Sequence, residues 1–88
     1  MNKYNKYIKD AINAIMDTEC NIKLSELGIK IKKNLYEKKI LISFKKKKIS
    51  PNTYIKYTCN NLKTFISNYT DYQITKFDND IYCNTISN

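Results

Sequence analysis

The chain contains no histidine, no tryptophan and no arginine, and it has a single glycine and a single proline. Without histidine it lacks the most common general base, and without a glycine-rich loop it lacks the usual backbone cradle for phosphates. Its eight acidic residues are scattered and form no recognisable catalytic pair. We therefore predict no catalytic residues and no cofactor, and a binding protein rather than an enzyme.

Cysteine is also scarce. Cys20, Cys59 and Cys83 are odd in number and far apart, whereas a structural zinc site needs four thiolate or imidazole ligands in close pairs. We expect no metal site and three reduced thiols, with Cys59 and Cys83 filling small spaces in the core. Reduced thiols indicate an intracellular protein, either cytoplasmic or nuclear.

Long hydrophobic runs are missing as well. Residues 1–7 lack the apolar stretch of a signal peptide, and no segment approaches the roughly 20 apolar residues of a membrane span. The 88 residues correspond to one small domain covering 1–88. We expect a soluble monomer or weak dimer with no membrane contact.

Positive charge is what the chain has in excess. Sixteen basic residues, all lysine, face eight acidic ones, which gives a net charge of +8. Such a surplus attracts polyanions, whether nucleic acid, an acidic protein surface or an anionic membrane, and by itself it selects none of them. The abundance of lysine, asparagine, isoleucine and tyrosine is equally typical of AT-rich coding sequence, so the surplus has either a functional or a compositional origin.

Hydrophobic periodicity predicts three helices. The first spans 3–17, the second follows a serine cap at Ser25, and the third runs without a break from Pro51 to Tyr69 after a cap at Ser50. Gly28 in the second helix is expected to let another backbone approach closely. The apolar run 40–44 fits either the end of that helix or an extended segment.

The remaining segments predict a small sheet. Residues 22–24 alternate as a very short strand, and Tyr72 to Cys83 alternate around a turn at Asp78 to Asp80, which indicates a β-hairpin. The order is that of an α+β winged helix-turn-helix, with three helices, a short strand and a C-terminal hairpin wing. The predicted core comprises Ile8, Ile12, Ile15, Leu27, Ile31, Leu35, Leu62, Phe65, Ile66 and Ile74.

Three motifs carry a family resemblance. Leu24-Ser25-Glu26-Leu27-Gly28, then Asn61-Leu62-Lys63-Thr64-Phe65-Ile66, then the strands around Tyr72-Gln73-Ile74 and Ile81-Tyr82-Cys83 resemble the LOTUS domain, the OST-type winged helix, over roughly residues 8 to 83. Asn61 replaces a frequent glycine of the family, and 40–49 has no counterpart. The resemblance implies a module of RNA-regulating proteins that binds RNA, including guanine-rich structured RNA, or docks a DEAD-box helicase. With only 84–88 after the wing, we expect the shorter, RNA-binding type.

A polar stripe on the third helix is the predicted nucleic-acid site. Lysines there would neutralise phosphates, Asn60 would hydrogen-bond a base or sugar, and Tyr57 would stack a base. RNA is favoured over DNA. The lack of arginine argues against sequence-specific reading, because lysine has no planar fork for guanine. The candidate residues are Lys45, Lys46, Lys47, Lys48, Lys56, Tyr57, Asn60 and Lys63.

A DNA-binding winged helix is one alternative function. Protein docking is the other, with a helicase, another protein or a second copy as partner. Ile29, Tyr36 and Ile40 form a second apolar side of the second helix, and surplus apolar surface commonly marks an interface. We expect the first helix and the wing to cover this side instead, which would leave no interface there.

Overall fold

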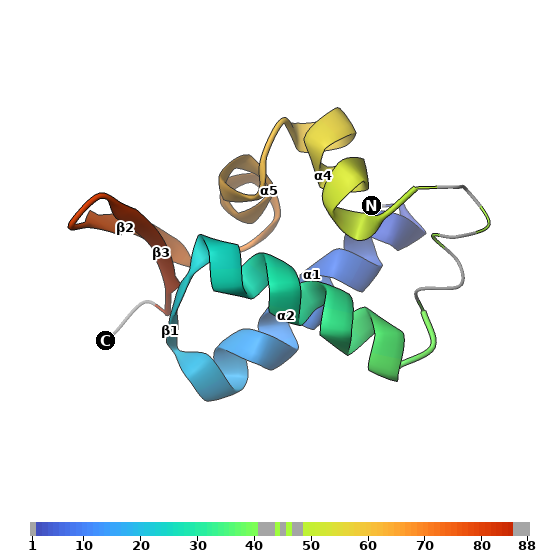
Figure 1. Cartoon of the computed structure of the whole chain (residues 1–88), viewed down its shortest axis with the longest axis horizontal. Helices are drawn as coiled ribbons and strands as arrows, with labels where there is room; N and C mark the ends of the chain where they lie inside the picture. Colours follow the sequence, from blue (N-terminus) through green and yellow to red (C-terminus); the bar gives the residue numbers. More distant parts are fainter. Residues whose placement is uncertain (1, 41–43, 45, 47–48, 86–88) are drawn as a thin grey trace.

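The computed structural model describes residues 2–40, 44, 46 and 49–85, and within them it shows four helices and a three-stranded antiparallel sheet. The helices are α1 (Lys3–Glu19), α2 (Leu24–Glu37), α4 (Pro51–Cys59) and α5 (Leu62–Tyr69), and the strands are β1 (Asn21–Lys23), β2 (Gln73–Phe77) and β3 (Asp80–Asn84). In Figure 1, α1 and α2 cross at the centre, α4 and α5 lie above them, and the sheet lies at the left end.

The predicted hairpin and its third strand are confirmed. The sheet order is β1-β3-β2, with Ile22 opposite Cys83 and Cys83 opposite Ile74. The loop between β2 and β3 has only two residues, Asp78 and Asn79, and both have positive φ angles, which asparagine and aspartate tolerate better than most residues. Asp80, expected in the turn, is the first residue of β3.

The third helix was predicted wrongly as one continuous element. It is broken at Asn60, which takes a φ of 75°, and α5 begins after Asn61, whose side-chain oxygen accepts a hydrogen bond from the Thr64 amide at 2.8 Å. Asparagine tolerates the left-handed region and is a strong N-cap, so two in succession end one helix and start the next. The start is as predicted, with Pro51 in the first turn and Ser50 accepting from the Thr53 amide.

The second helix also differs at both ends. Ser25 does not cap it, because α2 already begins at Leu24. Lys23 is the N-cap residue, and its side chain makes no capping hydrogen bond. At the other end Lys39 has a φ of 59°, and the amide of Ile40 donates to the Leu35 carbonyl at 2.9 Å. This Schellman arrangement ends the helix before the apolar run 40–44, of which 41–43 lie outside the described residues.

One hydrophobic core joins all of these elements. Most of the predicted core residues are fully buried, whereas Leu62 and Ile74 are only partly buried and pack against its edge. Cys59 and Cys83 are buried as expected, and Cys20 is exposed. The buried core residues outside the predicted core list are Tyr4, Ala11, Met16, Ile22, Phe44 and Ile55.

Aromatic contacts tie the start of α1 to α4. Phe44 packs edge-on against Tyr4 and Tyr54, with ring centroids 5.1 and 6.0 Å apart, and the Tyr54 hydroxyl donates to Asn5 Oδ1 at 2.7 Å. Asn5, the one buried polar residue of the described part, is thereby satisfied. These contacts set the position of α4, and through it that of the candidate site.

Candidate nucleic-acid interface

Four of the eight predicted binding residues lie where α4 meets α5. Lys56 and Tyr57 lie in the last turn of α4, Asn60 is its C-cap, and Lys63 lies in the first turn of α5. All four are exposed, and 78% of Tyr57 is accessible to solvent. We call these four residues the corner. The predicted stripe thus exists as a bend between two helices rather than as one face of a single helix.

The lysines of the corner have no acidic partner in the described part of the chain. Its ion pairs are Lys23 with Asp80, Lys30 with Glu19, and Lys33 with Glu37. The reason is visible in the sequence, because no aspartate or glutamate occurs between Glu37 and Asp71. That carboxylate-free segment contains half of the lysines of the chain: Lys38, Lys39, Lys45, Lys46, Lys47, Lys48, Lys56 and Lys63.

The other predicted basic patch is described only in part. Lys46 is exposed, whereas Lys45, Lys47 and Lys48 lie outside the described residues.

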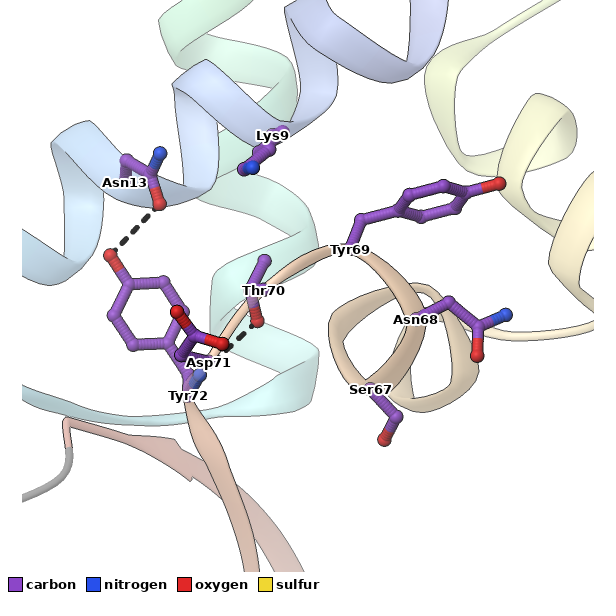
Figure 2. A pocket seen from close by; sticks show the side chains of 8 residues that line it. All are labelled: Lys9, Asn13, Ser67, Asn68, Tyr69, Thr70, Asp71 and Tyr72. Carbon is purple, nitrogen blue, oxygen red and sulfur yellow. Dashed lines mark hydrogen bonds between the residues drawn. The ribbon is translucent and has the colours of Figure 1, made fainter. Parts of the chain in front are cut away.

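A polar cleft that the sequence did not indicate lies at the far end of α5. Its volume is about 580 Å³, and it is lined by Lys9, Asn13, Ser67, Asn68, Tyr69, Thr70, Asp71 and Tyr72. Figure 2 shows Lys9 and Asn13 on α1, facing the connection from α5 to β2. The Tyr72 hydroxyl donates to Asn13 Oδ1 at 2.9 Å, and the Tyr72 amide donates to Thr70 Oγ1 at 3.3 Å. Asn13 is half-buried in this contact.

The chemistry of the cleft is that of hydrogen bonding. Burial raises the pKa of the Tyr72 phenol above its ordinary value, with the charge of Asp17 acting in the same direction. The phenol is therefore neutral near pH 7 and acts as a donor. Within the described residues no group of three or more histidine, cysteine, aspartate or glutamate side chains is placed to hold a metal ion. No sequence signal marks this cleft, because Asn13 and Tyr72 are 59 positions apart.

The second apolar side of α2 is not covered, contrary to expectation. Ile29 and Tyr36 are 71% and 70% exposed. The first helix and the wing pack elsewhere, against the side that buries Leu27, Ile31 and Leu35. Ile40 separates from the other two, because it lies beyond the end of α2 and folds back onto the core. Of the three residues predicted to form an interface, only Ile29 and Tyr36 are therefore exposed together on α2.

Comparison of the chain with protein-family models, with curated proteins and with solved structures finds no match. Of the described helices, none is long and apolar enough to cross a membrane.

Proposed function

We propose that the chain is a winged-helix domain of the LOTUS type that acts as a non-catalytic RNA-binding module. The order of elements supports the winged helix: α1 and β1 precede α2, two short helices follow, and the hairpin closes the fold. The pairing of β1 with β3 also supports it, since this contact anchors the hairpin to the helices as a wing requires. In this reading α5, which directly precedes the hairpin, occupies the place of the recognition helix.

The absence of any carboxylate between Glu37 and Asp71 is the observation that carries the binding function. A uniform compositional bias toward lysine would leave acidic residues interspersed among the basic ones. Here the surplus is concentrated in one stretch, and the two lysines of the corner are exposed without a counter-charge in the described part. Such a surface attracts the phosphate backbone and releases its counterions.

The side chains of the corner suit RNA with accessible bases. Lys56 and Lys63 would contact phosphates, and Tyr57 would present a ring on which an unpaired base stacks, a contact worth about 1 to 3 kcal/mol. The Asn60 amide offers both a donor and an acceptor to a base edge or a ribose hydroxyl. Because all basic groups are lysines, affinity would come mainly from charge, and sequence preference would be weak.

The test is the binding of a labelled RNA hairpin, followed by fluorescence anisotropy over a range of salt concentrations. We expect the double variant Lys56→Gln/Lys63→Gln to bind about tenfold more weakly and to show a salt slope shallower by roughly 1 to 2 units, because two phosphate contacts are lost. Tyr57→Ser should weaken binding with no change in the slope, because stacking releases no counterions.

The matched control is Lys6→Gln/Lys76→Gln, which removes the same charge from exposed positions on α1 and β2. Equal losses in both double variants would show that only total charge matters, and the corner would not be the site. A dissociation constant that does not change between low and physiological salt would contradict the phosphate contacts altogether.

A further inference from the structure

The exposed face of α2 carries two apolar anchors in line. Ile29 and Tyr36 are seven positions apart, so they lie on the same side of the helix, two turns and about 10 Å from each other. Each exposes about 70% of its surface to solvent. Because neither contributes to the core, this stripe is not explained by the stability of the fold.

The stripe lines a shallow groove. Ile29, Lys32, Lys33 and Tyr36 come from α2, and Asn52 on the first turn of α4 adds the opposite wall, enclosing about 540 Å³. The groove is apolar at Ile29 and Tyr36, and Lys32 and Lys33 lie between these two anchors along the helix. Its length of two turns matches the stretch that one partner helix presents through residues at i, i+3 or i+4, and i+7.

The positive charge of the groove favours an acidic partner over a second copy of the chain. Lys32 has no ion pair in the part of the chain that the structure describes, and Lys33 faces Glu37 at 4.0 Å, an exposed pair that holds it weakly. A second copy of this chain would bring the same lysines against each other and would add its own net charge of +8. Electrostatics therefore disfavours self-association through this face and favours an acidic partner.

We infer that the α2 groove binds an acidic amphipathic helix of another protein. Two or three apolar side chains of the partner would pack on Ile29 and Tyr36, and flanking glutamates or aspartates would pair with Lys32 and Lys33. This is a function beyond RNA binding, and it uses side chains that the corner does not include. The domain would then hold RNA through the corner and a protein through α2.

The test uses a designed, fluorescein-labelled peptide of about 16 residues, with leucines at i, i+4 and i+7 and glutamates beside them. Two matched peptides serve as comparisons: one has every glutamate replaced by lysine, and one has the same composition in an order without an apolar stripe. Anisotropy with the full chain should show binding of the acidic amphipathic peptide at least about tenfold tighter than that of either comparison. Equal binding of the three peptides, or no binding, would overturn the inference.

Substitutions then locate the site. Ile29→Ser and Tyr36→Ser should each weaken peptide binding by about tenfold, since truncation of a central apolar anchor removes much of the affinity. Phe77→Ser is the matched control, because Phe77 is equally exposed, at 71%, but lies on the hairpin. Circular dichroism checks that all three variants keep the helical content of the parent chain. An unchanged affinity in Ile29→Ser and Tyr36→Ser would overturn the assignment to this groove.

Two measurements distinguish other occupants. In sedimentation equilibrium of the chain alone, we expect no dimer that depends on Tyr36. A dimer that is lost in Tyr36→Ser would show that the groove binds a second copy of the chain instead of an acidic helix. In NMR titrations, the peptide should shift the amides of residues 29 to 36, and the RNA hairpin should shift those of the corner. If the RNA hairpin shifts the amide signals of residues 29 to 36 and displaces the peptide, the groove is a nucleic-acid surface. Because the RNA experiments use other residues, the two proposals fail independently.

Discussion

The packing around Gly28 leaves room for a side chain. Its position lies inside α2 without a positive φ, and a Cβ built there would meet Asn52 Oδ1 at 3.8 Å, an ordinary contact. Among the residues that the structure describes, no close backbone approach requires the glycine, contrary to the expectation from sequence. Its flexibility only adds entropy to the unfolded chain.

We therefore predict that Gly28→Ala stabilises the domain by about 0.5 to 1 kcal/mol, because alanine is the better helix former and restricts the unfolded chain. Urea unfolding followed by circular dichroism measures the change. A loss of stability would mean that α2 and α4 approach each other more closely than this contact distance allows.

The three cysteines should differ sharply in reactivity. Cys20 is exposed at the end of α1, whereas Cys59 and Cys83 are buried. Burial also raises the pKa of the Cys83 thiol to about 11, which leaves it unreactive near pH 8 because the thiolate is the nucleophile. A thiol reagent should show one fast reaction that disappears in Cys20→Ser, and two more only after unfolding. Fast reaction of a second cysteine in the folded chain would contradict the buried positions.

Among the elements, the helix ends decide where the candidate residues lie. The break at Asn60 and Asn61 turns a predicted straight stripe into a corner, and it depends on the hydrogen bond from the Thr64 amide to Asn61. An unbroken helix would carry Lys63 on the same cylinder as Lys56. The position of Lys63 relative to Lys56 is therefore set by a cap.

Removal of this cap has a measurable cost. Asn61→Ala should destabilise the domain by about 1 kcal/mol, because the Thr64 amide loses its partner. Asn61→Asp is the control, since aspartate caps as well as asparagine and should keep most of the stability. If urea unfolding shows equal losses of stability for both variants, the side-chain NH2 group of Asn61, and not the capping oxygen, is the group that stabilises the domain.

Local patterns were enough to predict most elements but not their ends. Alternation and turn chemistry identified the hairpin, and the Ser50-Pro51 start was correct. The spacing of apolar residues could not reveal the break, because α5 continues the apolar pattern of α4. The Asn60-Asn61 pair was the available signal.

Tertiary packing was beyond the reach of these patterns. Periodicity showed that α2 has two apolar sides and placed Leu27 correctly in the core, but only the packing showed that the side with Ile29 stays exposed. The cleft at Asn13 and Tyr72 likewise joins segments with no local relation. For the four residues of the corner, the sequence predicted their exposure but not their arrangement around a bend.

At the scale of the whole molecule, the burial of two side chains in the described part of the chain couples stability to alkaline pH. Burial raises the pKa of Cys83 from 9.0 to about 11, and burial followed by the charge of Asp17 raises that of Tyr72 above 10.0. Below pH 9 both groups are protonated in the folded and in the unfolded chain. Above it the unfolded chain ionises first, so unfolding releases protons and the folded state is disfavoured.

We therefore expect the free energy of unfolding to fall as the pH rises from 9 toward 11. Urea unfolding at a series of pH values measures this slope. In Cys83→Ala the fall should be shallower, whatever the absolute stability of the variant, because one of the two groups is gone. A parallel slope in the variant would show that Cys83 does not ionise more readily on unfolding.

The pairing of β1 with β3 has a consequence for the order in which the chain folds. Asn21 lies opposite Asn84, and the Thr85 amide donates to the Cys20 carbonyl at 2.9 Å, so three of the described helices, α2, α4 and α5, lie within the loop that this contact closes. Closing so long a loop costs entropy that only preformed packing can offset. We expect the α1 and α2 pair to form in the folding nucleus and the three residues of β1 to join last. Substitutions in β1 should then speed unfolding and leave the folding rate almost unchanged.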